Sequence, residues 1–268
     1  MSNRRIQVAA LASTPIKGLR VAARSRIMLE RGGVRCDRRF YLVDEDARMV
    51  NGKQLGALNT VTADLDEREQ RLTLTFPGGE TIAGAIELGE TLQSSFFSRS
   101  RPARMLLGPF SSALSEHVGR SLRLVAPADG SAAVDRGEQG AVSLISRASL
   151  SSLARVAGKD EIDARRFRMS IEVAGTDPHE EDGWIERELT IGAARIVLHG
   201  HVGRCIVTSR HPDSGEVDLA TLDHLRAYRS SASTTEPLAF GVYGSVERPG
   251  IVHIGDAVKI VQRTPTSW

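Results

Sequence analysis

Apolar and polar residues alternate along much of this chain in short runs, which is typical of strands that bury one face. The sequence RLTLTF at 71–76 alternates strictly and stops at a Pro-Gly-Gly turn, and LRLVAP at 122–127 repeats the pattern. Segments rich in β-branched and aromatic residues predict further strands elsewhere in the chain. These segments are 6–13, 38–46, 166–175, 189–210 and 240–261, the last two being divided by glycine turns.

Two segments have helical spacing instead. In 146–158, Leu150 and Leu153 indicate a single buried face. In 218–229, apolar residues recur at every third position, Asp218 is placed to cap the helix start, and arginines fall near the helix end. Many short strands with few helices predict a mainly β, α+β fold, with helices packed outside β-barrels.

The predicted domain organisation depends on one segment without periodicity. Residues 128–140 are small, polar and glycine-containing, so they form either a connection between two domains or a surface loop within one. We place the boundary just before this segment. The sequence then divides into an N-terminal β-barrel-like domain at 1–125 and a second β-barrel domain with flanking helices at 126–268.

Charge and cysteine content narrow the classes of function. A net charge of +2 gives no general attraction to nucleic acids or anionic membranes. No apolar stretch approaches membrane-spanning length. The short apolar run near the N-terminus is predicted to be a strand and not a signal peptide, so we expect a cytoplasmic protein. Cys36 and Cys205, the two cysteines, cannot form a disulfide framework or hold an iron–sulfur cluster alone.

The residues alone leave three interpretations of Cys205 open: an inert packing residue, a nucleophile or a metal ligand. If 199–205 were one regular strand, His199, His201 and Cys205 would share a face and suit zinc or copper. The glycines within this segment weaken the assumption of a regular strand.

Charged clusters elsewhere are also open to two interpretations. Lys17, Arg38 and Arg168 each lie at a turn or in a strand, so they are either solvated or part of a phosphate cradle. The acidic sequence TDPHEEDGW at 176–184 lacks the EF-hand pattern of a calcium site. We therefore expect it to be a solvated loop.

Six motifs follow one another along the chain: STPIKGLR, CDRRFYLVDED, RFRMSIEVAG, EEDGWIERELTIG, GRCIVTSRHPDSGEVDLATLDHLRAYR and FGVYGSVERPGIVHIGDAV. This ordered set resembles the MOSC family, named after the C-terminal domain of molybdenum cofactor sulfurase, with its N-terminal β-barrel partner domain. Mitochondrial amidoxime-reducing components have the same two-part layout. The resemblance extends over residues 5–262 and is strongest from Cys205 to Asp256.

The resemblance implies a molybdenum-cofactor oxidoreductase of the molybdopterin type. Such an enzyme reduces N-hydroxylated or related small substrates by two electrons, which a separate flavin or iron–sulfur protein supplies. Cys205 matches the family cysteine that ligates molybdenum, so it is the implied metal ligand and catalytic residue. The other implied cofactor-binding residues are Lys17, Gly18, Arg38, Lys53, Arg168, Ser170, Arg204 and Thr208.

The chain departs from the family motifs at several of these positions. Gly18 follows the lysine where amidoxime reducers have serine, Ser170 stands where asparagine is frequent, and Lys53 stands where arginine is common. An alternative function therefore stays open, in which Cys205 is a nucleophile or persulfide carrier in sulfur transfer or C–S bond chemistry. A third possibility is a protein that binds and delivers the cofactor without turnover.

Overall fold

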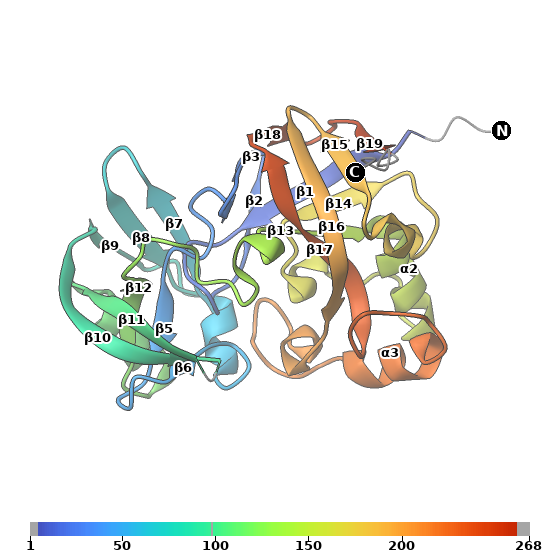
Figure 1. Ribbon diagram of the computed structural model, residues 1–268. Helices are drawn as coiled ribbons and strands as arrows, with labels where there is room; N and C mark the ends of the chain where they lie inside the picture. The colour runs from blue at the N-terminus through green and yellow to red at the C-terminus, as the bar shows by residue number, and fades with distance from the viewer. Residues whose placement is uncertain (1–4, 98, 262–268) are drawn as a thin grey trace.

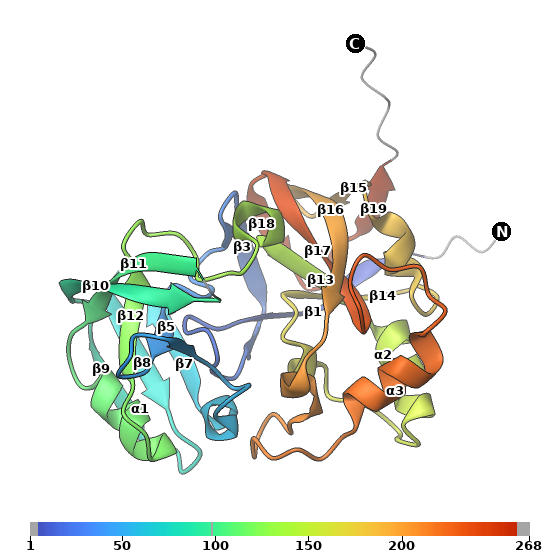
Figure 2. The same cartoon turned by 60° about the horizontal axis from the view of Figure 1, so that its bottom comes forward.

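The computed structural model describes residues 5–97 and 99–261, which form two β-rich parts side by side (Figure 1). One part contains residues 41–127 and is drawn in blue through cyan to green. The other contains the N-terminal strands and most of the chain after residue 140. Turning the molecule leaves the two parts distinct, with helices on the outer side of each (Figure 2).

The part that contains the N-terminal strands and most of the chain after residue 140, called the second part below, is organised around an eight-stranded sheet. Its neighbouring strands are antiparallel, apart from one parallel pair between β13 and β14 in the middle of the sheet. In spatial order the sheet contains β19 (Val258–Val261), β15 (Glu188–Ile191), β16 (Ala194–Gly203), β17 (Ala239–Arg248), β13 (Val142–Ser146), β14 (Ile171–Ala174), β1 (Gln7–Ser13) and β2 (Ala22–Arg24).

The first strands of the chain therefore belong to sheets of its second half. In β1, Leu11 pairs with Ile171 of β14. A separate three-stranded sheet joins β18 (Gly250–His253), β3 (Arg26–Glu30) and β4 (Gly33–Val34). Strands from both predicted ranges therefore share these sheets, and the sheets by themselves do not fix a domain boundary. The division into 1–125 and 126–268 stays a prediction.

Among the described residues, the other part contains two sheets, the helix α1 (Phe110–Val118) and the short helix η1 (Gly56–Thr60). Helix α1 was not predicted from the sequence; it buries Phe110 and Leu114 against the sheets. The core of this part also includes Ile16 and Leu19, which flank the Lys17–Gly18 turn. The two sheets are β10 (Leu88–Phe96), β11 (Arg99–Leu106), β12 (Arg123–Pro127), β5 (Tyr41–Val43) and β6 (Met49–Val50), and β7 (Thr62–Asp66), β8 (Arg71–Thr75) and β9 (Thr81–Ala85).

Both predicted helices are present, although one starts later than expected. Helix α2 (Arg147–Val156) is capped by Ser146, the residue before it, whose side chain accepts a hydrogen bond from the Ser149 amide. Helix α3 (Thr221–Arg229) begins three residues after Asp218, so the prediction that Asp218 caps it is wrong. The Asp218 carboxylate binds Arg166 instead.

The mainly β, α+β fold predicted from the hydrophobic pattern is confirmed. Strands supply the two main cores, while α2 and α3 cover a smaller apolar cluster on the outside of the large sheet. Among residues 5–97 and 99–261, no helix is long and apolar enough to cross a membrane.

Candidate functional site

A cleft of about 520 Å³ lies where segments of the two parts meet. This volume is typical of sites for small molecules and cofactors. Eight of the nine site residues predicted from the sequence line it, although they come from widely separated segments. The first half of the chain contributes Lys17, Gly18, Arg38 and Lys53, and the second contributes Arg168, Arg204, Cys205 and Thr208.

Cys205 is exposed, so the interpretation as an inert packing residue is wrong. It follows the end of β16 and precedes the short helix η5 (Ile206–Ser209) in extended conformation. The Thr208 amide and hydroxyl both donate hydrogen bonds to the Cys205 carbonyl, at 3.0 and 2.9 Å. The Thr208 carbonyl in turn accepts from the Thr221 hydroxyl at 2.8 Å. These bonds fix the turn that carries Cys205, which lines the cleft.

Arg38 and Arg168 both line the cleft, and the side chain of Arg38 contacts the backbone of Arg168. Both adopt left-handed backbone conformation, with φ of +50° and +57°. Nη2 of Arg38 donates to the Arg168 carbonyl at 3.1 Å, and its Nη1 binds the buried carboxylate of Asp37. Asp37 also accepts a hydrogen bond from the Thr14 amide, so the turn is held from the N-terminal strand.

The Arg168 guanidinium is left with an unused donor. Burial, assisted by the positive charge of Arg38, lowers its pKa to about 10. Its Nη2 is buried and has no hydrogen-bond partner among the residues that the structure describes. Burying a cationic donor without a hydrogen-bond partner costs folding free energy. This nitrogen is therefore suited to donate a hydrogen bond to an anionic or carbonyl oxygen of a ligand.

Lys17 forms an ion pair with a carboxylate of the protein itself, and not with the anion of a ligand. Its Nζ lies 2.6 Å from Asp135 and 5.1 Å from the centre of the Phe97 ring. Burial lowers the pKa of Lys17, Asp135 opposes this shift, and Arg38 and Arg168 add to it. Asp135 is 45% exposed and lies in the 128–140 connection, so it can leave when a stronger anion arrives.

Arg204 also lines the cleft, but its guanidinium is occupied by the protein. Nε donates to the Phe240 carbonyl at 2.7 Å, Nη1 to the Phe167 carbonyl at 2.9 Å, and Nη2 contacts Phe240 and Met169. Burial lowers its pKa to about 9. Arg204 thus ties β17 to the turn that presents Arg168, which makes it a positioning residue.

The remaining predicted residues differ in how they meet the cleft. Gly18 has a φ of +101°, and a Cβ there would lie 3.1 Å from Asn51, so a serine at this position would be strained. Lys53 lines the cleft, and its carbonyl accepts a long bond of 3.4 Å from Arg210. Ser170 is outside the lining. Its buried amide donates to the hydroxyl of Ser143, which does line the cleft.

Sequence reasoning missed several lining residues. Tyr243 belongs to the FG-x-Y motif and lies under the guanidinium of Arg136, 4.4 Å from the ring centre. Arg136 pairs with Glu236 at 2.6 Å; both side chains line the cleft and are about one-third exposed, so the pair borders its mouth. The motif was the available signal for Tyr243. No local pattern marks Arg136 or Glu236, because their pairing joins segments 100 residues apart.

The zinc hypothesis does not fit the geometry. Bulges interrupt the pairing of β16 with β17, so His199 is exposed and binds Ser245, whereas His201 is buried. Nδ1 of His201 accepts from the Thr235 amide at 3.0 Å. Within the described part of the chain, no group of three or more His, Cys, Asp or Glu residues could hold a metal ion.

The acidic segment 176–184 is not a solvated loop, so that expectation is wrong. Glu181 is fully buried and accepts hydrogen bonds from the Ser146 amide and the Ser149 hydroxyl. Asp182 binds Arg229 at 2.6 Å and lies 3.5 Å from Nε2 of His201. The carboxylates of Glu181 and Asp182 stabilise the interior of the fold, because donors from three elements bind them.

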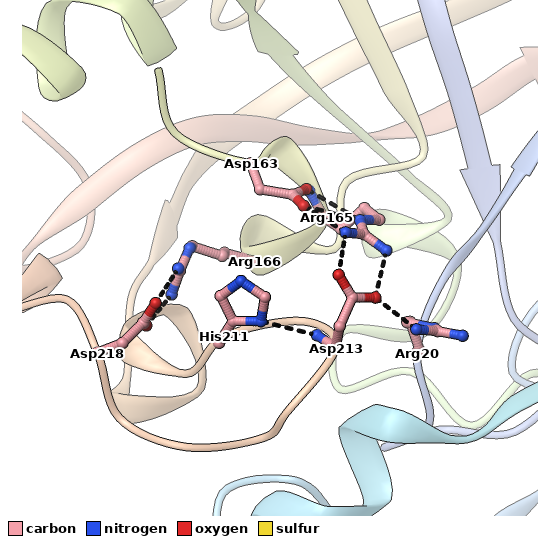
Figure 3. A network of polar contacts seen from close by, with 7 residues as sticks. All are labelled: Arg20, Asp163, Arg165, Arg166, His211, Asp213 and Asp218. Atoms are coloured by element: carbon pink, nitrogen blue, oxygen red, sulfur yellow. Dashed lines mark hydrogen bonds and ion pairs between the residues drawn. The ribbon is translucent and has the colours of Figure 1, made fainter. Parts of the chain in front are cut away.

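A second network holds the loop that follows Cys205 (Figure 3). Asp213 accepts hydrogen bonds from Arg165, at 2.9 and 2.8 Å, and from Arg20 of the N-terminal half, at 2.5 Å. Arg166 forms a two-point contact with Asp218, at 2.6 and 2.7 Å. The Arg20–Asp213 pair joins the two halves of the chain next to the cleft, and the other two pairs hold the loop within the second half.

The fold and the cleft define a two-part protein with its cysteine-bearing turn in the second part. A model described as MOSC domain matches residues 131–259, and one described as MOSC N-terminal beta barrel domain matches residues 5–107. The chain therefore belongs to the MOSC family, as the ordered motifs predicted.

Curated relatives are named after amidoxime reduction. Mitochondrial amidoxime-reducing component 1 of Xenopus laevis is 25% identical, covering 85% of this chain and 73% of that protein. Mitochondrial amidoxime reducing component 2 of Rattus norvegicus is 29% identical, covering 84% and 75%. Molybdenum cofactor sulfurase of Oryza sativa is 33% identical over 39% of this chain, which is 13% of its own length.

Proposed function

We propose that this chain is a molybdenum-cofactor oxidoreductase that reduces N-hydroxylated or related small substrates by two electrons. The observation that carries the proposal is the convergence of the exposed Cys205 thiol with Lys17, Arg38 and Arg168 in one cleft. A molybdopterin-type cofactor has an anionic phosphate and a metal that accepts thiolate ligands. The relatives named for amidoxime reduction support the choice of substrate class.

The residues present fit such a group. The unpartnered Nη2 of Arg168 is a donor for a polar edge of the pterin, and Lys17 exchanges Asp135 for the phosphate. Cys205 holds the metal through its sulfur. When bound, the cofactor supplies the two-electron chemistry, while the protein positions it and excludes water.

The protein's own groups act by holding and orienting. Thr208 fixes the carbonyl of Cys205, and Arg204 keeps the turn that carries Arg168 against β17. Arg136 and Glu236 border the mouth, where a small substrate enters beside Tyr243. The electrons come from a separate electron-transfer protein, because the two cysteines cannot hold an iron–sulfur cluster.

Metal analysis tests the proposal. Protein from a host that makes the cofactor is expected to carry molybdenum near one atom per chain, and Cys205→Ser is expected to lose at least nine-tenths of it. Cys36→Ser is the matched control and keeps the wild-type content. Absence of molybdenum from correctly folded wild-type protein would overturn the proposal.

One observation favours a second candidate, sulfur transfer by Cys205. The thiol is exposed, and one relative is a molybdenum cofactor sulfurase. In this chemistry a donor persulfide passes its outer sulfur to the Cys205 thiolate, which becomes a persulfide while the donor becomes a thiol. Mass spectrometry after incubation with a persulfide donor distinguishes the two, since a sulfur adduct on Cys205 without bound molybdenum supports only the second.

A further inference from the structure

A small cavity of about 10 Å³ adjoins the main cleft and shares Asn59, Arg166, Arg168 and Val207 with its wall. This is the size of one water-sized occupant. Its other polar lining residues are all arginines: Arg20, Arg165 and Arg210. Five arginines from both halves of the chain therefore surround a space for a single small species.

Carboxylates neutralise only part of this charge. Asp163, Asp213 and Asp218 bind the side chains of Arg20, Arg165 and Arg166 (Figure 3). Within residues 5–97 and 99–261, neither Arg168 nor Arg210 forms an ion pair at 4 Å or less. The side chain of Arg210 donates instead to the carbonyls of Gly215, at 2.8 Å, and Lys53, at 3.4 Å.

Polar atoms beside the cavity also lack partners. Nε of Arg210 and both amide atoms of Asn59 are buried, and none has a hydrogen-bond partner among the described residues. Asn59 is 5% exposed and packs so closely on Gly52 that a Cβ there would lie 2.4 Å from its Oδ1. Asn59 is therefore fixed at the boundary between the cleft and the small cavity, with its donor unused.

We propose that this cavity binds one small monovalent anion of the size of chloride. Nε of Arg210 and Nδ2 of Asn59 donate to it, and Arg168 contributes positive charge. A water molecule would satisfy these donors but would leave Arg168 and Arg210 without a counter-ion among the described residues. The volume of about 10 Å³ is that of one water-sized occupant, which chloride matches in size.

The anion would connect the cysteine-bearing segment to the N-terminal half. Val207 and Arg210 follow Cys205 within five residues, while Arg20 and Asn59 belong to the other half. Occupancy therefore stabilises the segment that positions Cys205. The inference does not depend on the molybdenum cofactor, because the cavity lies beside the cleft and Arg210, one of its two donors, lines the cavity only.

Thermal unfolding of the full chain in bromide tests the proposal. Sodium bromide replaces sodium gluconate at constant ionic strength, since gluconate is too large to enter. The midpoint of wild-type protein is expected to rise by about 3 °C when bromide exceeds its dissociation constant tenfold. Asn59→Asp supplies its own negative charge and is expected to abolish the response, and Arg210→Gln removes a donor and a charge with the same result.

The matched control is Arg226→Gln, which removes an exposed arginine paired with Asp223 on α3. It is expected to keep the full bromide response. Anomalous diffraction from a bromide-soaked crystal is expected to place one bromide between Arg210 and Asn59. A wild-type midpoint unaffected by bromide, an equal response in Asn59→Asp, or a water in the cavity without anomalous signal would each overturn the proposal.

Discussion

Cys36 and Cys205 are the same residue type in opposite surroundings. Cys36 is half-buried beside Glu67, and burial together with this carboxylate raises its pKa to about 12. Cys205 is exposed in a cleft whose nearest charged groups include Arg168. The first environment keeps the Cys36 thiol protonated and therefore unreactive, whereas the Cys205 thiol is accessible beside a cationic side chain. Neighbours from distant segments, and not the cysteine itself, decide which chemistry is available.

The arginines of the cleft differ in a similar way. Arg204 directs its guanidinium nitrogens at protein acceptors, whereas Arg168 keeps one buried nitrogen without a partner among the described residues. An arginine saturated by the protein stabilises the fold, and one that is not saturated is available to a ligand. Charge and location alone do not distinguish the two roles.

The largest expected effect concerns thiol reactivity. In Cys205→Ala, alkylation of Cys36 by iodoacetamide at pH 8 is expected to be about 1000-fold slower than that of an ordinary cysteine. The reason is that a pKa raised from 9.0 to about 12 lowers the thiolate fraction by that factor. The rate rises tenfold per pH unit up to pH 11, as measured by mass spectrometry. Equal rates for Cys36 and Cys205 in the native protein would remove the contrast.

The next largest effect distinguishes the role of Arg168 from that of Arg204. Arg168→Gln is expected to lower cofactor affinity about tenfold with the fold intact, because one charge-assisted contact is lost. Molybdenum retained after dialysis measures this, with the midpoint of thermal unfolding as a check on folding. Arg204→Gln is expected to lower the midpoint as well, because three carbonyl contacts disappear. Identical behaviour of the two variants would contradict the distinction.

A smaller gain is expected from Asp135→Asn. This change removes the carboxylate that competes for Lys17 but keeps the side-chain shape. Cofactor retention is expected to rise about threefold in the same dialysis assay, since an exposed ion pair is worth no more than about 1 kcal/mol. Glu236→Gln, at the cleft mouth, is the control that leaves Lys17 untouched. A fall in retention would show that Asp135 supports the cofactor instead.

The smallest effect tests the buried acidic segment. Burial, with Arg229, lowers the pKa of His179 to about 4, so this ring is neutral in the folded protein. The unfolded chain takes up its proton near pH 6.5, so stability is fully present above that pH and is lost as the pH falls toward 4. The loss is about 1 kcal/mol after allowing for partial exposure. His179→Asn flattens this dependence in urea unfolding, whereas exposed His199→Asn does not.

Much of the fold was predictable because its signals are local. Period-two alternation marked β8 and helical spacing marked α2, since each pattern reflects which face is buried, and apolar residues marked β12, which is buried along most of its length. Helix α1 was missed because its sequence, FSSALSEHV, buries only Phe110 and Leu114 and has no side-chain cap. The family resemblance likewise pointed to nine candidate residues, eight of which line one cleft, although their roles stay predictions.

The sequence by itself determined the strands, the family and the residue types that meet in the cleft. Only the tertiary structure decided which charges are used up. It buried Glu181, which local sequence suggested was solvated, and placed Asp135 on Lys17 across 118 residues. It also left Arg168 and Asn59 with buried polar atoms that have no hydrogen-bond partner within residues 5–97 and 99–261. The physical reason is that hydrogen-bond satisfaction depends on partners brought together by folding, and no local pattern contains them.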